Sequence, residues 1–148
     1  MCFVCGERNP AGLHVNFYEQ EDGSVLARFA GVDHHQGYPG RMHGGVITAL
    51  MDETIGRAIM TRYGEAIWGV TVELNVRFLK PVPLGTPLTA AGRITVDRSR
   101  IFEGTSELYL PDGSVAAEAA GKYIKMDITR IADFDAEREE WYIRPDPS

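Results

Sequence analysis

The sequence is poor in basic residues, in cysteine and in long apolar runs, and these shortages exclude several classes of protein. Its 148 residues carry 15 lysines and arginines against 21 aspartates and glutamates, which gives a formal net charge of −6. A nucleic-acid-binding domain would carry a basic face, so no nucleic-acid partner is expected. No apolar run approaches the roughly 20 residues of a membrane span, and the opening residues lack the pattern of a secretory signal. We therefore expect a single cytoplasmic domain over residues 1–148, with no membrane-embedded part.

The only cysteines, Cys2 and Cys5, form a C-x-x-C pair near the start of the chain. Such a pair can supply half of a zinc site, which needs four ligands, and His14, His34 and His35 are the candidates for the rest. A redox-active C-x-x-C normally follows a βαβ pattern, which is absent here. We expect a reduced, metal-free pair in an N-terminal flap over residues 1–12, and no cofactor.

A tight loop meets the start of an apolar helical pattern at two adjacent glycines, Gly44 and Gly45. Glycine allows a sharp turn and the close approach of another molecule. The residues that follow contain no proline and are rich in Ala, Leu, Met and Ile, which predicts a helix over 45–62 with Gly64 as its C-terminal cap. The start of this helix presents free N–H groups and a partial positive charge, which can polarise a carbonyl or hold an anion.

Two adjacent carboxylates, Asp52 and Glu53, lie inside this predicted helix. Glu53 precedes Arg57 by four residues, a spacing typical of an ordinary surface ion pair. Asp52 has no cation at helical spacing, because its neighbours on the helix are Thr48, Ala49, Ile55 and Gly56. A carboxylate is rarely buried without compensation, so Asp52 is the candidate for acid–base or nucleophilic chemistry.

Six segments have the alternation or the apolar content of β-strands, and Gly- and Pro-containing turns separate them. They cover residues 13–20, 24–30, 70–78, 88–96, 102–110 and 115–126. In the third segment, Thr71 and Asn75 belong to the polar face. One long apolar helix with two strands before it and four after it predicts an α+β fold, in which a single antiparallel sheet of about six strands wraps the central helix. Because such a helix needs covering on all sides, we expect the chain to self-associate.

Two of the segments outside these elements have a distinctive composition. Residues 31–42 form an irregular loop rich in Gly, Pro and His, a composition that often carries function. Residues 127–148 form an acidic tail, which is either docked through Trp141 and Tyr142 or partly disordered.

Two blocks of the sequence resemble a known family. The first is His43-Gly44-Gly45 followed by Asp52 nine residues after the histidine, and the second is the strand at residues 69–82. Together they resemble the acyl-CoA thioesterases of the hotdog fold, in particular the phenylacetate-pathway (PaaI-like) group. The opening residues 2–13 resemble a subset of the same superfamily, so the likeness covers about residues 2–126.

The resemblance implies hydrolysis of an acyl-CoA thioester to a free acid and a thiol, at a site shared between the subunits of a homodimer or a dimer of dimers. Gly44 of one subunit would polarise the carbonyl, and Asp52 of the other would activate water or attack. His43 would shape the turn or orient the thioester, and Thr71 would assist the water or the acyl group. Within one chain, Gly44 and Asp52 are also too far apart to act on the same carbonyl, because eight helical residues span roughly 12 Å. The candidate substrate-binding residues are Gly45, Gln36, Glu53 and Asn75.

Two alternatives keep the fold and change the function. One is a protein that binds acyl-CoA without catalysis, and the other is a hydratase or dehydratase, which would need a catalytic histidine paired with the acid in one pocket. Many relatives carry Asn or Gln six residues before the histidine of the motif. This chain has Gly37 there, so Gln36 beside it is the candidate for that role.

Overall fold

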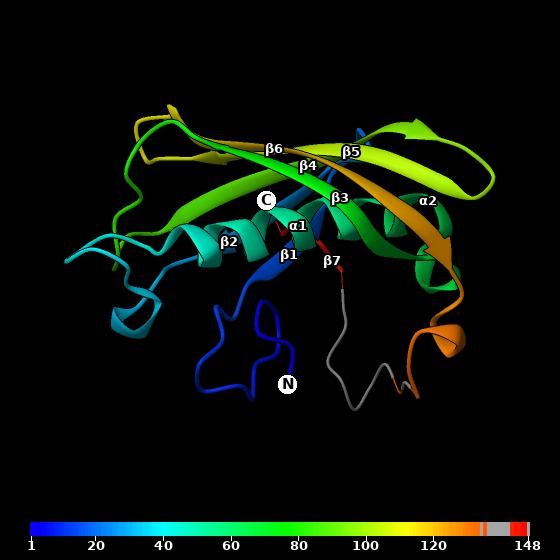
Figure 1. Ribbon diagram of the computed structural model, residues 1–148, viewed down its shortest axis with the longest axis horizontal. Coiled ribbons are helices and arrows are strands. Elements are labelled where there is room, and N and C mark those ends of the chain that lie inside the picture. Colours follow the sequence, from blue (N-terminus) through cyan, green and yellow to red (C-terminus); the bar gives the residue numbers. More distant parts are fainter. Residues whose placement is uncertain (134, 136–142, 148) are drawn as a thin grey trace.

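One long helix and a single curved sheet form the main part of the described structure, in the arrangement that the sequence predicts. The computed structural model describes residues 1–133, 135 and 143–147. The helix α1 (Gly44–Ala58) has 15 residues and lies under the sheet, which curves over it (Figure 1). The strands are β1 (Asn16–Glu19), β2 (Val25–Phe29), β3 (Trp68–Phe78), β4 (Leu88–Asp97), β5 (Ile101–Tyr109), β6 (Val115–Met126) and β7 (Arg144–Pro145). This is the α+β hotdog architecture.

The sheet contains seven strands in the order β3-β6-β5-β4-β2-β1-β7. The six predicted strands pair antiparallel, whereas the two-residue β7 is an addition that pairs parallel with β1. This strand belongs to the predicted tail, whose Trp141 and Tyr142 lie outside the described residues. Within the described part of the chain, β3 pairs only with β6, so its other edge is open along 11 residues.

The predicted helix over 45–62 is divided into two. After α1 ends, Ile59 separates it from the short α2 (Met60–Tyr63), and Gly64 follows with a positive φ of 58°. In the described part of the chain there are also three single turns of 3-10 helix: η1 (Asp33–His35), η2 (Gly64–Ala66) and η3 (Ile128–Arg130). Among the described residues, no helix combines the length and the apolar character that crossing a membrane requires.

The first strand begins three residues later than its alternating pattern predicts. Leu13 and Val15 are buried, but their N–H groups bond to the carbonyl oxygens of Phe3 (2.9 Å) and Val4 (2.9 Å). The N-terminal flap is therefore paired with the segment that leads into β1. This pairing brings the C-x-x-C turn against the core beside α1.

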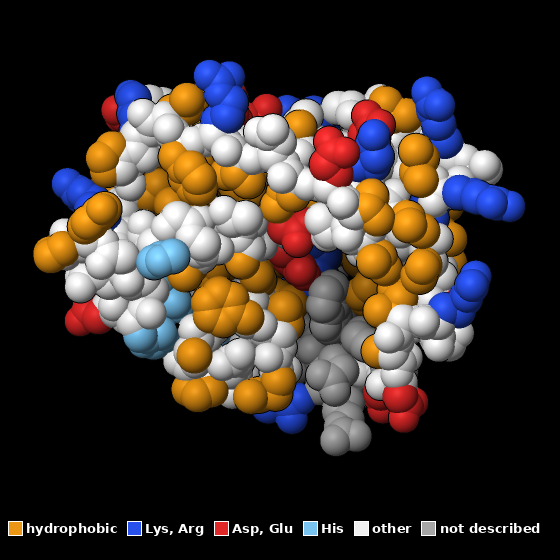
Figure 2. All heavy atoms as spheres, in the orientation of Figure 1, with side chains coloured by type: hydrophobic (Ala, Val, Ile, Leu, Met, Phe, Trp, Pro, Cys, Tyr) orange, Lys and Arg blue, Asp and Glu red, His pale blue; other side chains and the backbone are white. Residues whose placement is uncertain are grey.

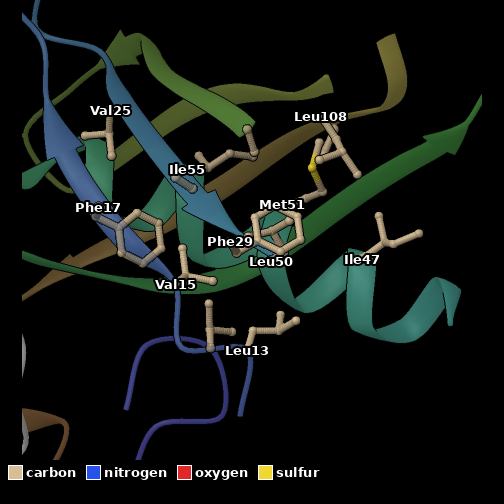
Figure 3. Close-up of a cluster of buried hydrophobic side chains, with 14 of the residues drawn as sticks. Leu13, Val15, Phe17, Val25, Phe29, Ile47, Leu50, Met51, Ile55 and Leu108 are labelled. Atoms are coloured by element: carbon tan, nitrogen blue, oxygen red, sulfur yellow. The ribbon is translucent and has the colours of Figure 1, made fainter. Parts of the chain in front are cut away.

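The core lies between α1 and the sheet. Side chains from β1, β2, β5 and α1 meet there, as Figure 3 shows for Phe17, Val25, Ile55 and Leu108. Two glycines let the helix approach the sheet closely: a Cβ at Gly92 would lie 2.6 Å from the Thr54 carbonyl oxygen, and one at Gly104 would lie 2.6 Å from the Ile55 side chain. The helix α1 therefore packs closely against β4 and β5, as well as against the alanine-rich β6.

Candidate active site

The start of α1 offers one unused backbone donor. His43 is the N-cap residue: its Nδ1 accepts from the Gly45 N–H (2.8 Å), and its carbonyl oxygen accepts from the next two N–H groups. Among the described residues, the Gly44 N–H has no hydrogen-bond partner. The start of the helix therefore offers a free N–H donor and a partial positive charge to a ligand. Gly45, predicted to bind substrate, has its N–H already occupied by His43.

Asp52 is held by two hydroxyl groups. Its Oδ1 accepts from Thr71 Oγ1 (2.9 Å) and from the Tyr123 hydroxyl (2.9 Å), whereas no group among the described residues bonds to Oδ2. The carboxylate is therefore oriented through one oxygen and available through the other. It lines a small pocket together with Glu53, Gly56, Arg57, Met60, Trp68, Gly69, Thr71 and Tyr123. Figure 2 shows acidic side chains near the middle of this face with apolar side chains around them.

A β-bulge at Val72 directs Thr71 toward Asp52, which corrects the prediction that Thr71 lies on the polar face of its strand. Thr71 pairs with Tyr123 and Leu74 pairs with Gly121, so β3 has one more residue than β6 over this stretch. The extra residue is Val72, which is 52% exposed. Because side chains alternate along a strand, one inserted residue places Thr71 on the helix-facing side that it shares with Leu74.

Tyr123 was not among the predicted site residues. Its ring stacks on Phe102, with centroids 4.9 Å apart and planes 6° apart, and its side chain is fully buried. Glycines make room for this ring: a Cβ at Gly121 would lie 2.6 Å from the ring of Tyr123, and one at Gly69 would lie 3.3 Å from it. Burial and the nearby charge of Asp52 raise the pKa of the Tyr123 hydroxyl, which stays a donor. The signal in the sequence was a lone tyrosine two residues after a glycine in an alanine-rich strand.

Glu53 lies in the same pocket, but its ion pair is not the surface pair that the spacing predicts. Arg57 Nε donates to Glu53 Oε1 (3.0 Å), and the Arg57 side chain is only 1% exposed. Its Nη2 also donates to the sulfur of Cys5 (2.9 Å), and its guanidinium lies 5.0 Å from the centre of the Phe17 ring. Burial raises the pKa of the Glu53 carboxyl, and the charge of Arg57 opposes that rise. The docked N-terminal flap covers this pair, which sequence spacing alone did not reveal.

The structure does not bring the remaining predicted residues into the Asp52 pocket of the same chain. Gln36 is exposed and its Oε1 accepts from the Gly40 N–H (2.9 Å), so it stabilises its own loop. Asn75 pairs with the exposed Ala120 on the outer face of the sheet, away from α1. Their roles in substrate binding stay predictions.

The histidines proposed as metal ligands lie elsewhere. His35, for example, accepts from the Val32 N–H and bonds to the Ala11 carbonyl oxygen. Within the described ranges, the one group of side chains spaced for a metal is Cys2, Cys5 and Glu53, whose donor atoms lie within 4.8 Å of one another. Arg57 already bonds to two of these three, and a structural zinc site takes four ligands. The donor set therefore does not fit a structural zinc ion.

Comparison with known proteins identifies the family. A family model described as "Thioesterase superfamily" matches residues 39–117, which is more than half of the chain and includes both Gly44 and Asp52. The chain belongs to the thioesterase superfamily. This membership agrees with the resemblance of the two sequence blocks.

Individual members of the thioesterase superfamily match at modest identity. A mouse protein named acyl-coenzyme A thioesterase THEM4 is 28% identical over 112 residues, which are 75% of this chain and 47% of that protein. The chain thus spans about half the length of the curated relatives it matches. The solved structure of the thioesterase superfamily protein RHA08564 is 30% identical, with a TM-score of 0.76 over 82% of this chain and 62% of that one.

The PaaI-like part of the resemblance has support in fold only. The structure of the E. coli PaaI protein, from the phenylacetic acid degradation operon, is 18% identical with a TM-score of 0.69. The alignment covers 77% of this chain and 80% of that one. The two proteins therefore share the fold.

Proposed function

We propose that this chain hydrolyses an acyl-CoA thioester at a site formed by two subunits, with Gly44 from one and Asp52 from the other. The observation that carries the proposal is the state of the Asp52 carboxylate. Two hydroxyls fix Oδ1, Oδ2 has no hydrogen-bond partner among the described residues, and Asp52 lines the pocket. A carboxylate held in this way can take a proton from water or attack a carbonyl itself. The name of the mouse relative supports acyl-CoA as the substrate class.

The second component is an electrophilic site for the carbonyl oxygen. The Gly44 N–H at the start of α1 is an unused donor, and a preformed donor at a helix N-terminus stabilises the oxyanion that develops during acyl transfer. Gly44 and Asp52 lie on the same uninterrupted helix, however, which holds them roughly 12 Å apart. Both groups must lie near about 3 Å from the reacting atoms. Two copies of the chain are therefore required to complete one site.

The open edge of β3 supplies the contact that brings the two halves together. Thr71 near one end of this strand bonds to Asp52, and at the other end the Phe78 ring lies beside Gly44, 3.5 Å from where its Cβ would be. Suppose that two β3 edges pair antiparallel about a two-fold axis between Leu74 and Asn75. Thr71 of each copy then lies opposite Phe78 of the other, so Asp52 of one subunit meets Gly44 of its partner. An open strand edge of this length, with Val72 and Phe78 exposed, is also unfavourable in a monomer.

The reaction class is tested by incubating the purified protein with a panel of aryl, short-chain and medium-chain acyl-CoAs. We expect release of free CoA together with the acid, measured by chromatography so that Cys2 and Cys5 do not react with a thiol dye. Saturable binding with no CoA release would favour the non-catalytic alternative. Consumption of an enoyl-CoA with the thioester intact would favour a hydratase.

The shared site is tested by mixing two inactive variants. Gly44→Pro removes the backbone donor at the first helical position, where proline is tolerated, and Asp52→Asn removes the carboxylate. Each homodimer should be nearly inactive. A mixed dimer has one site with both changes and one site with neither, so we expect about half of the activity per wild-type dimer to return. Gly44→Ala is the matched control, because it keeps the N–H and its Cβ makes an ordinary contact with Phe78. No recovery in purified heterodimers would place both groups within one chain.

A further inference from the structure

A buried cluster of two thiols, a carboxylate and a guanidinium lies beside the candidate active site and has no part in the mechanism above. Arg57 Nη2 donates to Cys5 Sγ (2.9 Å) and Arg57 Nε donates to Glu53 Oε1 (3.0 Å). Cys5 Sγ lies 4.0 Å from the same Glu53 oxygen, and Cys2 Sγ is within 4.8 Å of both. Cys5 is buried and Cys2 is partly exposed, so Cys2 is the more accessible residue of the pair.

The turn that carries the two cysteines is fixed by local bonds. The Val4 N–H donates to Cys2 Sγ (3.3 Å), and the Gly6 N–H closes the turn on the Cys2 carbonyl oxygen (3.0 Å). Glycine is required at this position, because a Cβ there would lie 2.6 Å from the Cys2 backbone nitrogen. The two sulfurs are therefore held next to each other by the backbone itself.

The electrostatics of the pair divide it into one thiolate and one thiol. The hydrogen bond from the Cys5 thiol, helped by backbone N–H groups and by the charge of Arg57, outweighs burial and lowers the pKa of Cys2 to about 5. The bond to Cys2 and burial together raise the pKa of Cys5 far above the usual range. Cys2, the partly exposed residue, is thus the thiolate at neutral pH, and the buried Cys5 keeps its proton.

We propose that Cys2 and Cys5 are a redox-active dithiol, in which Cys2 is the sulfur that a hydroperoxide oxidises and Cys5 is the one that then closes an intramolecular disulfide. This goes beyond the reduced, inert pair that the sequence predicts. Arg57 and Glu53 are positioning residues: they hold Cys5 beside Cys2 and do not react.

The chemistry balances with a hydroperoxide as the oxidant. The Cys2 thiolate attacks the terminal oxygen, the O–O bond breaks, and the leaving oxygen departs as an alcohol or as water after taking a proton. Cys2 is now a sulfenic acid. Cys5 then gives up its proton as its sulfur attacks Cys2 Sγ, the S–O bond breaks, and water leaves. One hydroperoxide is reduced and two thiols are oxidised to one disulfide.

Oxidation would also change the charge beside the Asp52 pocket. Glu53 and Arg57 line that pocket and contact the cysteine pair, so loss of the Cys2 negative charge leaves Arg57 with less compensation. An effect on catalysis rests on the proposed function. The dithiol does not, because its oxidation is read from masses and thiols.

The experiment treats the reduced full-length protein with hydrogen peroxide and follows its intact mass and its free thiols. We expect the mass of the chain to fall by about 2 Da, both thiols to disappear together, and dithiothreitol to restore both. The matched variant Cys5→Ser should instead gain about 16 Da at Cys2 and be trapped by dimedone, since no second thiol can resolve the sulfenic acid. In Cys2→Ser the buried Cys5 should keep its thiol.

Three outcomes would overturn the proposal. Both thiols could persist under peroxide, disulfide-linked dimers could form in place of the internal bond, or one zinc per chain could protect both sulfurs. If either serine variant fails to fold, the wild-type tryptic fragment 1–8 decides, because it contains both cysteines and carries the mass change. None of these readouts requires thioester hydrolysis, so a protein inactive on acyl-CoAs can still show the disulfide.

Discussion

Asp52 and Glu53 are adjacent on α1 and line one pocket, yet their carboxylates are held by opposite kinds of neighbour. Asp52 accepts from two neutral hydroxyls on the sheet, which orient it without cancelling its charge. Glu53 is paired with the buried guanidinium of Arg57 under the N-terminal flap, which neutralises it. A carboxylate held by neutral donors keeps its charge available for chemistry, whereas a carboxylate paired with a buried cation mainly stabilises the fold. From this contrast we propose a catalytic role for Asp52 and a stabilising role for Glu53.

Replacing Asp52 should have the largest effect, and it should act on catalysis. In Asp52→Asn the amide oxygen can still accept from Thr71 and Tyr123, so the fold should be kept while the acid–base or nucleophilic group is lost. We expect kcat on the best acyl-CoA to fall by at least about 10²-fold, the low end for positioned acid–base catalysis. Steady-state kinetics and a thermal melt measure the two effects separately. Wild-type turnover in Asp52→Asn, with Glu53→Gln inactive, would reverse the assignment of the two carboxylates.

Replacing Glu53 should mainly lower the stability of the fold. Glu53→Gln leaves the buried Arg57 with a weaker partner, and we expect the free energy of unfolding to fall by roughly 2 kcal/mol. Urea denaturation measures this change. The matched control is Glu118→Gln, which breaks an exposed pair with Arg77 and should cost less than about 1 kcal/mol. Equal losses in the two variants would show that the Glu53 pair behaves as a surface pair.

The hydroxyl donors should have an intermediate effect on catalysis. Tyr123→Phe keeps the ring stacked on Phe102 and removes one donor to Asp52 Oδ1, so we expect kcat to fall about tenfold with KM nearly unchanged, equivalent to about 1.4 kcal/mol. Thr71→Val should lower kcat less, because the Tyr123 donor remains. If KM rises and kcat stays, these residues contact the substrate and do not position the carboxylate.

The last prediction concerns pH and the flap that covers Glu53. The folded protein lowers the pKa of the Cys2 thiol to about 5, mainly through the hydrogen bond from Cys5, whereas an unfolded thiol titrates near about 8.5. The stabilisation that this charge provides is therefore complete above the unfolded value and is lost as pH falls through about 5. We expect the stability difference between wild type and Cys2→Ser to shrink from pH 8 toward pH 5. Denaturation curves at several pH values, with both proteins reduced, measure it. A constant difference would mean that Cys2 is not a thiolate in the folded state.

The sequence predicted the elements well because periodicity is a local property. The helix pattern after Gly44 and the alternation of the later strands placed α1 and β3 to β6 close to their observed bounds. The structure also agrees with the expectation that Asp52 has no cation partner, since among the described residues only Thr71 and Tyr123 bond to its carboxylate. Its catalytic role stays a prediction.

What the sequence missed depends on contacts between distant segments. Arg57 and Glu53 are four residues apart, which indicates a surface pair, and only the docked flap makes it a buried one. Tyr123 lies 71 residues after Asp52, so nothing local connects the two. The first strand begins late because its leading residues pair with the flap. In each case a partner that is remote in the sequence decides the environment of a side chain whose own pattern was read correctly.

The extra residue at Val72 reverses which side chains of β3 point toward the helix. Residues before it and after it on β3 follow two different phases, and only the combination directs both Thr71 and Leu74 toward the helix. Deleting this one exposed valine would restore perfect alternation and at the same time turn Thr71 outward, taking a donor from Asp52. An alignment that counts β3 without the bulge therefore compares inward-facing residues of one protein with outward-facing residues of another.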